Sequence, residues 1–149
     1  FREVQKAKEV TQEMTDAFSE LYLNSAADSL PPVTAIALYD EFKELTPVGA
    51  RGDEMIRKLA DRLVGIDLLD DGARLLEEQV KFRLKGKERA RVAARLAVVH
   101  LMNHDFIKAR DVLNSTNEAN LSLPLVEERR HLRGFLSAHT TCWRRVLSQ

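Results

Sequence analysis

Apolar residues recur every three or four positions along most of this chain, a spacing that places them on one face of an α-helix. The clearest run is Ile56, Leu59, Ala60, Leu63 and Ile66. It follows the i, i+3, i+4, i+7 pattern of an amphipathic helix. No stretch carries a convincing strand pattern, so the sequence predicts an all-α protein.

Turn signals divide this pattern into about seven helices. Prolines 31 and 32 and the polar or glycine-containing stretches 46–49, 85–87 and 114–120 interrupt the periodicity. A further weak point is His139-Thr140-Thr141, because β-branched residues disfavour helix. The predicted helices span residues 2–26, 32–45, 53–66, 69–84, 88–102, 105–115 and 124–137, with a last short helical piece that holds Trp143, Val146 and Leu147.

The first predicted helix carries an apolar seam with heptad spacing. This seam is typical of a coiled coil, but also of one amphipathic helix that packs on its neighbour. The second interpretation is favoured, because three heptads is the shortest run that the coiled-coil pattern calls for. The seam consists of Val4, Ala7, Thr11, Met14, Phe18 and Leu21.

An internal repeat links the middle helices. The positions Ile56, Leu59, Ala60 and Leu63 recur 37 residues later as Ala93, Leu96, Ala97 and His100. In the helices that follow, Ala73 and Leu76 recur 36 residues later as Ala109 and Val112. Small residues stand at the same places in both copies, as close helix packing requires. The repeating unit is therefore a helix–turn–helix of about 36 residues.

Residues 93–113, AARLAVVHLMNHDFIKARDVL, resemble the tetratricopeptide repeat family. The first copy, residues 56–76, shares these positions but has one extra residue at its turn, and a third unit from Leu125 is degenerate. The matching positions are Leu96 and Ala97 for the family's Leu-Gly/Ala pair, Asp105-Phe106 for its Asp-Tyr turn and Ala109 for its second-helix alanine.

The resemblance implies one domain over residues 1–149, built as antiparallel hairpins that form an α-α superhelix, or solenoid. Its parts would be an N-terminal hairpin or cap at 1–46, repeats at 53–85 and 88–120, and a degenerate repeat or cap at 124–149. The structural repeat positions that it implies are Ile56, Leu59, Ala60, Leu63, Ala73, Ala93, Leu96, Ala97, Phe106 and Ala109.

Residues 44–63 also resemble repeat proteins of alphaproteobacteria. Because the chain begins with Phe1 rather than Met, we expect it to be a segment of a larger bacterial repeat protein.

In the family, the first helix of each repeat lines a concave groove, which implies a partner-binding strip in this chain. The strip places cationic side chains beside apolar ones, and would suit a peptide with an acidic and an aliphatic side chain. An ordinary solvated helix face is the alternative. The strip residues are Glu54, Arg57, Asp61 and Val64 in the first copy, and Arg91, Ala94, Val98 and Leu101, with Arg95 adjacent, in the second.

We therefore expect a non-enzymatic scaffold that binds a partner protein. One alternative is a structural spacer or self-association segment of a longer repeat protein, which would form a homo-oligomer. Another is an accessory module of an enzyme or of a metal-binding protein. Catalytic motifs such as a phosphate-binding glycine loop or His-Glu-x-x-His are absent, so we expect no catalytic residues, no metal and no cofactor.

Charge and composition narrow the partners. Lys+Arg and Asp+Glu both total 23, so the net charge is zero and nucleic acid is not an expected partner. No apolar run approaches the roughly 18 residues that a membrane span needs, so we expect no membrane insertion. The one cysteine, Cys142, allows no disulfide within the chain. This is compatible with the cytoplasm, which we favour slightly, and does not exclude an oxidising compartment such as the periplasm.

Two histidines four residues apart, His100 and His104, suggest either a metal site or a turn between the end of one helix and the start of the next. The repeat register favours the turn, because His100 falls at the packing position of Leu63. We then expect Asn103 or His104 to be left-handed and Asp105 to cap the next helix.

The C-terminal region holds two further features. Its arginines indicate a solvated face or salt bridges rather than a phosphate site. Trp143 beside Cys142 indicates a cap or core anchor. The arginines are Arg129, Arg130, Arg133, Arg144 and Arg145.

Overall fold

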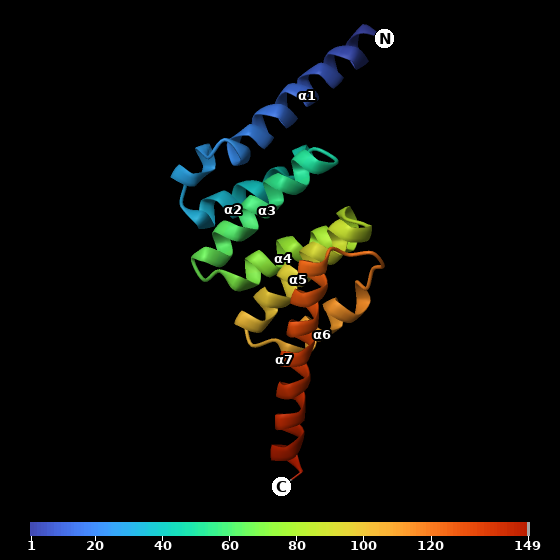
Figure 1. The fold of residues 1–149 in the computed structure, drawn as a ribbon. Helices are drawn as coiled ribbons and strands as arrows, with labels where there is room; N and C mark the ends of the chain where they lie inside the picture. The colour runs from blue at the N-terminus through green and yellow to red at the C-terminus, as the bar shows by residue number, and fades with distance from the viewer. Residues whose placement is uncertain (149) are drawn as a thin grey trace. The chain divides into compact units, whose positions relative to one another are not determined.

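The computed structural model describes the backbone of residues 1–148 and the side chains of residues 1–139, 145 and 148. Over these residues the fold contains seven α-helices and no strand, which confirms the all-α class and the number of helices (Figure 1). The α-helices are α1 Arg2–Leu23, α2 Pro32–Phe42, α3 Ala50–Gly65, α4 Leu69–Glu78, α5 Gly86–Met102, α6 Phe106–Ser115 and α7 Leu123–Leu147.

Three short helical segments extend or join these helices. The 3₁₀ segments are η1 Ala26–Ser29 and η2 Lys43–Leu45, and the π-helical segment η3 Gln79–Arg83 continues α4. The chain divides into two compact units, Phe1–Leu75 and the residues from Leu76 onward. The division falls inside α4, and each unit is described by itself.

Aromatic side chains of α1 and α2 form one part of the core of the first unit. The ring centroids of Phe18 and Tyr22 lie 5.3 Å apart. The ring of Phe18 lies 6.5 Å from that of Phe42, and the ring of Tyr22 lies 6.5 Å from that of Tyr39. The buried hydroxyl of Tyr22 donates a hydrogen bond of 2.8 Å to the carbonyl of Ala35. Burial raises the pKa of Tyr22 to about 12. The phenol is therefore a neutral donor that ties α1 to α2.

Basic side chains of α3 hold the chain segment between α1 and α2. Lys58 donates to the carbonyl of Leu23 at 2.9 Å, which satisfies a free carbonyl at the end of α1. Arg62 donates to the carbonyls of Ala27, Asp28 and Leu30 around η1. The predicted break before Pro31 is thus a short, well-bonded turn rather than a loose loop.

At Gly72, α4 lies against α3 with no room for a side chain. A Cβ on Gly72 would lie 2.7 Å from Val64 Cγ2 and 3.3 Å from the carbonyl oxygen of Ala60. Ala60 and Ala73 are both buried, but Gly72 is the residue that permits the contact. The prediction that Val64 faces a solvent-filled groove is wrong, because its side chain packs against α4.

In the second unit, one arginine joins α7 to the hairpin of α5 and α6. Arg129 is 2% exposed. Its guanidinium donates to the carbonyls of Ala90 at 2.7 Å, Leu113 at 2.9 Å and Thr116 at 3.0 Å. It also donates to the hydroxyl of Thr116 at 3.0 Å. Since carbonyls at a helix end have no partner within the helix, Arg129 supplies the donors that the end of α6 lacks.

Several helix boundaries differ from the prediction, and two of the differences have a clear physical reason. The third helix begins at Ala50 rather than Asp53, because Gly49 adopts a φ of +88° and Asp53 N–H already bonds to its carbonyl at 3.1 Å. The seventh helix continues as one element through residues 139–141. Intrinsic helix propensities differ by less than about 1 kcal/mol per residue, so two threonines do not stop a helix that is anchored by its packing.

Replacing Arg129 with methionine is expected to lower the free energy of unfolding by about 3 kcal/mol, because buried carbonyls would lose their charged donor. The control is Arg130→Met, at an exposed position whose side chain pairs with Glu127 of the same helix. It should change the stability by less than about 0.5 kcal/mol. Urea unfolding measures both, and equal midpoints for the two variants would contradict the structural role of Arg129.

Gly72→Ala is expected to destabilise the protein by about 1–3 kcal/mol, because the added methyl meets Val64 and the backbone of α3. Gly134→Ala is the matched control, since a Cβ there meets nothing within 4 Å. It should stabilise α7 by up to about 1 kcal/mol. Thermal unfolding would refute the close α3–α4 contact if both variants were stabilised.

Candidate functional site

The second unit contains an apolar groove of about 890 Å³ between α5, the start of α6 and α7. Its apolar lining comes from all three helices, and carboxylates and imidazoles supply its polar lining. The residues that line it are Val98, Leu101, Met102, His104, Phe106, Pro124, Glu127, Glu128, His131, Leu132, Phe135 and His139.

The turn from α5 to α6 shapes one end of the groove. His104 is left-handed, with a φ of 58°, and its N–H bonds to the carbonyl of Leu101 at 3.0 Å. Asp105 follows as the N-cap of α6 and accepts a bond from the N–H of Lys108 at 3.3 Å. This confirms the predicted left-handed turn and the capping role of Asp105. The turn places His104 and Phe106 on the groove wall.

Rings from α6 and α7 meet at this end of the groove. The ring of His139 lies 4.7 Å from Phe106 and 4.6 Å from Phe135, measured between centroids. Phe106 contacts His139 edge-on, with the planes at 87°. Phe135 is nevertheless 50% exposed, so a large apolar surface stays open to solvent inside the groove. Exposed aromatic rings in a concave site are typical of binding anchors.

The predicted strip in the second copy is placed only partly in this groove. Val98 and Leu101 line it. Arg91 and Arg95 are exposed on α5 but are not among the lining residues, and Arg91 donates to Glu88 of the same helix at 2.6 Å. The prediction that Ala94 faces solvent is wrong, since it is 1% exposed. The reason is that α5 is covered by η3, α6 and α7, so its buried surface is wider than one stripe.

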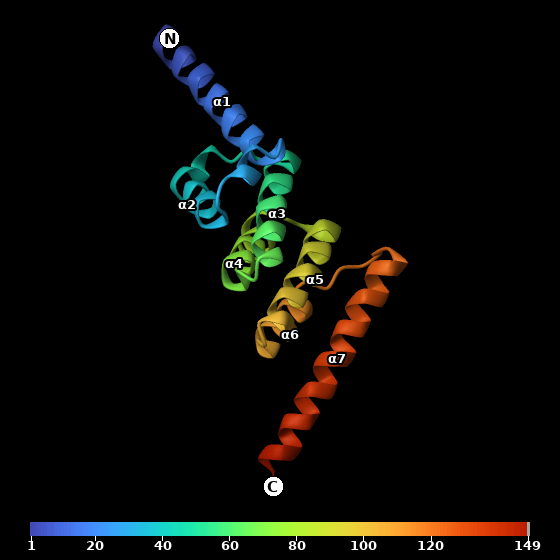
Figure 2. The ribbon, with the colours of Figure 1, turned by 90° about the vertical axis from the view of Figure 1, so that its left-hand side faces the viewer.

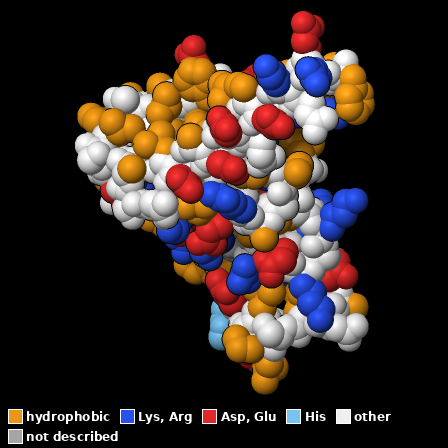
Figure 3. Space-filling view, turned by 90° about the horizontal axis from the view of Figure 1, so that it is seen from above, with side chains coloured by type: hydrophobic (Ala, Val, Ile, Leu, Met, Phe, Trp, Pro, Cys, Tyr) orange, Lys and Arg blue, Asp and Glu red, His pale blue; other side chains and the backbone are white. Residues whose placement is uncertain are grey.

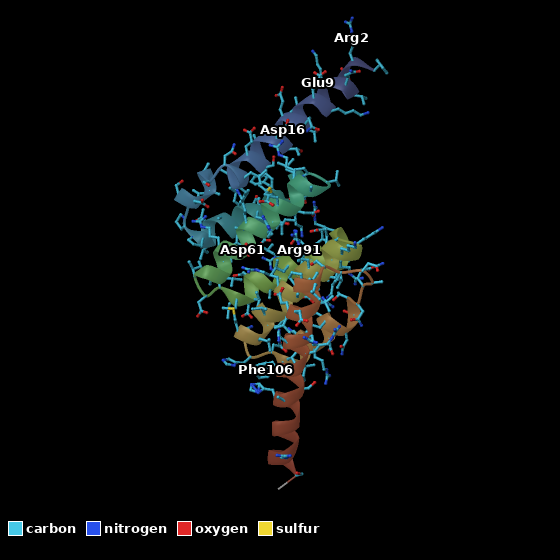
Figure 4. The ribbon with its side chains drawn as sticks, viewed as in Figure 1. Arg2, Glu9, Asp16, Asp61, Arg91 and Phe106 are labelled. Atoms are coloured by element: carbon cyan, nitrogen blue, oxygen red, sulfur yellow. The ribbon has the colours of Figure 1, made fainter. Side chains whose placement is uncertain are left out.

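The predicted strip residues of the first copy belong to the first unit. Glu54 and Arg57 form an ion pair of 2.7 Å on the surface of α3. Asp61 lines a smaller cavity of about 270 Å³, whose walls include Lys58 and Arg62. Both cations already donate to carbonyls of the segment between α1 and α2, so their role there is structural. Figure 4 labels Asp61, and also Arg91 and Phe106 of the second unit.

Sequence reasoning missed the α7 wall of the groove. Leu132, Phe135 and His139 are spaced by three and four and form one stripe of α7. The signal was present, but the helix was expected to weaken at residue 139. Two arginines of α7 differ from the expected solvated face or salt bridges: Arg129 is buried, and Arg133 donates to the carbonyl of Leu113 at 3.2 Å. Arg130 is exposed and pairs with Glu127, as expected. The side chains of Cys142, Trp143 and Arg144 lie outside the described residues.

The described side chains give no sign of a metal centre. Within this part of the chain, no group of three or more His, Cys, Asp or Glu residues is placed to hold a metal ion. His100 is 5% exposed and packs inside the second unit, at the register position of Leu63. Its burial lowers its pKa, an effect that the nearby carboxylates of Asp105 and Glu77 oppose.

The surface and the helices add two observations. On the face shown in Figure 3, acidic and basic side chains are intermingled rather than separated into fields of one sign. Within the described range, no helix combines the length and apolar character that crossing a membrane requires.

Compared with known proteins, the chain matches no protein-family model, no curated protein sequence and no solved structure.

The buried His100 predicts a pH dependence of stability. Because its pKa in the folded state is lowered from 6.5, the unfolded state binds more protons below that pH. The stability contributed by neutral His100 is therefore complete above about pH 6.5 and is lost as the pH falls toward the folded-state pKa.

We expect His100→Leu to reduce the loss of unfolding free energy between pH 7 and pH 5, which urea titrations at each pH measure. His131→Leu, at an exposed position, is the control and should leave the loss unchanged. An unaltered pH dependence in His100→Leu would show that this side chain does not carry the effect.

Proposed function

We propose that this chain is a non-enzymatic protein-binding module that takes an apolar segment of a partner protein in the groove between α5 and α7. The observation that carries the proposal is the open apolar groove of about 890 Å³ with the half-exposed ring of Phe135 at its wall. A volume of this size is within the range of ligand sites, and here it would accept several side chains of a helix or an extended strand.

The proposal includes a tetratricopeptide-like architecture, in which α3–α4 and α5–α6 are successive repeats of a solenoid. The sequence period and the residues shared by the two hairpins support it. Recognition would then use a preformed surface with little conformational change. The cytoplasm remains the favoured compartment, and the bacterial repeat proteins remain the proposed setting.

The charges that line the groove set a preference for the partner. The carboxylates among the lining residues are Glu127 and Glu128, and no lysine or arginine is among the described residues that line the groove. Glu127 also pairs with Arg130 of the same helix. We therefore propose a partner segment with apolar side chains on one face and lysine or arginine beside them. The sequence predicts a partner with an acidic side chain that would pair with arginines of α3 and α5. The groove offers such a side chain no arginine, because Arg91 and Arg95 do not line it.

A synthetic amphipathic helix of about 14 residues, with leucines on one face and lysines on its flanks, tests the groove. Fluorescence anisotropy should detect binding that Phe135→Glu weakens at least about tenfold, because the substitution places a charge on the apolar wall. Ile107→Glu is the matched control: Ile107 is an exposed apolar residue of α6 that does not line the groove.

A second peptide with glutamates in place of the lysines completes the test. It should bind more weakly than the lysine peptide at low salt, since it meets Glu127 and Glu128. Equal weakening by Phe135→Glu and Ile107→Glu, or no binding of either peptide, would refute the proposed site.

A further inference from the structure

A second surface, on α1, is unrelated to the groove. The first 14 residues of the chain are all exposed, although α1 is continuous from Arg2 to Leu23. Figures 1 and 2 both show the start of α1 running clear of α2 and α3, the helices of its own unit. In Figure 4 the labels Arg2, Glu9 and Asp16 mark this length of helix. An isolated helix of 12–15 residues is only marginally stable in water, so this segment lacks the packing that normally supports a helix.

The apolar stripe of α1 is different from the face that packs on its own unit. The packed face holds Phe18, Ser19 and Tyr22, which are all buried. The other stripe has the alternating spacing of three and four that defines a heptad seam. We call it the α1 stripe; its residues are Ala7, Val10, Met14, Ala17 and Leu21, of which the first four are exposed and the last is half-buried.

Exposure at the centre of the α1 stripe is high, with Val10 at 54% and Met14 at 48%. The seam expected from the sequence ran through Thr11 and Phe18 instead. Phe18 is used inside the first unit, where its ring meets Tyr22 and Phe42. The expectation that α1 simply packs on its neighbour therefore holds for its C-terminal third but leaves the α1 stripe uncovered.

The order of residues in the α1 stripe is self-complementary when two copies run in opposite directions. Around a twofold axis near residue 12, Ala7 of one copy faces Ala17 of the other, and Val10 faces Met14. The small pair lets the helices approach closely, and the large pair fills the centre. Side chains of matched size would thus meet in the four central layers, whereas Leu21, which is half-buried in its own unit, would lie opposite Glu3.

The residues beside the α1 stripe favour the same direction. One flank is uncharged, with Val4 and Thr11, and the other carries Lys6, Glu13 and Glu20. Glu20 also lies 3.9 Å from Arg51 of its own chain, an exposed and weak ion pair. In an antiparallel pair, each flank lies against the same flank of the second copy. The two uncharged flanks therefore pack together, and Lys6 faces Glu20 of the second copy. A parallel pair would instead set the charged flank against the uncharged one. The hydroxyl of Thr11 is already bonded to the carbonyl of Ala7 at 2.8 Å, so its methyl is free for apolar contact.

We propose that α1 is a self-association helix, which pairs antiparallel with α1 of a second copy of this chain through the α1 stripe. This pairing and partner binding in the groove use different residues, so the failure of one proposal would leave the other untouched.

Sedimentation equilibrium of the whole chain, from micromolar to millimolar concentration, should show a reversible monomer–dimer equilibrium. Val10→Glu should raise the dissociation constant at least about tenfold, since the charge enters the interface twice. Gln5→Glu, on the opposite and exposed side of α1, is the control and should have little effect. A chain that is monomeric at every concentration, or equal effects of both variants, would overturn the proposal.

Charge reversal tests the register. Lys6→Glu should weaken the dimer by about fivefold, and the double variant Lys6→Glu/Glu20→Lys should restore it, because two exposed ion pairs are reversed and then rebuilt. Glu13→Gln should tighten the dimer, since the two copies of Glu13 lie near each other beside the axis. Failure of the double variant to recover would contradict the antiparallel register.

Cross-linking tests the direction of the helices, in a Cys142→Ser background. A mixture of Ala7→Cys and Ala17→Cys chains should form mixed disulfide dimers in preference to dimers of either chain with itself. Preference for self-paired dimers would indicate parallel helices and overturn the proposal. Loss of the dimer in Phe135→Glu would also overturn it, because the α1 stripe would then be bound in the groove of a second copy.

Discussion

The buried guanidinium of Arg129 is the interaction on which the second unit depends. Its bonds to Ala90, Leu113 and Thr116 join three helices at one point: the start of α5, the end of α6 and the body of α7. Burial lowers the pKa of Arg129, and the neighbouring cation of Arg133 acts in the same direction. A buried charge is tolerated because both terminal nitrogens of the guanidinium donate to oxygen acceptors. Two of these, the carbonyls of Leu113 and Thr116, lie at the end of α6, where the helix itself supplies no donor. The groove is thus bounded on one side by a helix that this arginine positions.

The first unit uses the same physical device at another place. Arg62 and Lys58 of α3 bind carbonyls between α1 and α2, and these bonds fix a short turn without adding apolar core. In both units a long basic side chain reaches from one helix to the free carbonyls of another segment. Such residues are counted as surface charge in the sequence, although they connect elements.

The sequence predicts the parts of the fold that depend on local patterns. Helix spacing predicted seven helices, and the repeat register predicted the turn at His104 with Asp105 as the following helix cap. The errors at Ala94 and Val64 have a different cause: their exposure depends on which helices lie across α5 and α3, and local pattern does not contain that information. Only one wall of the groove could be predicted from the sequence. Val98 and Leu101 follow the repeat register, whereas Phe135 and His139 could be placed only by knowing that α7 continues past residue 139.

The central claim is that the second unit binds an apolar segment between α5 and α7. Methyl NMR during titration with the lysine-flanked peptide tests it most directly, because each methyl reports its own surroundings. The account predicts the largest shift changes at Val98, Leu101 and Leu132, which line the groove, and none at Leu59 in the core of the first unit. Saturable changes centred on other residues, with the three groove methyls unmoved, would contradict it.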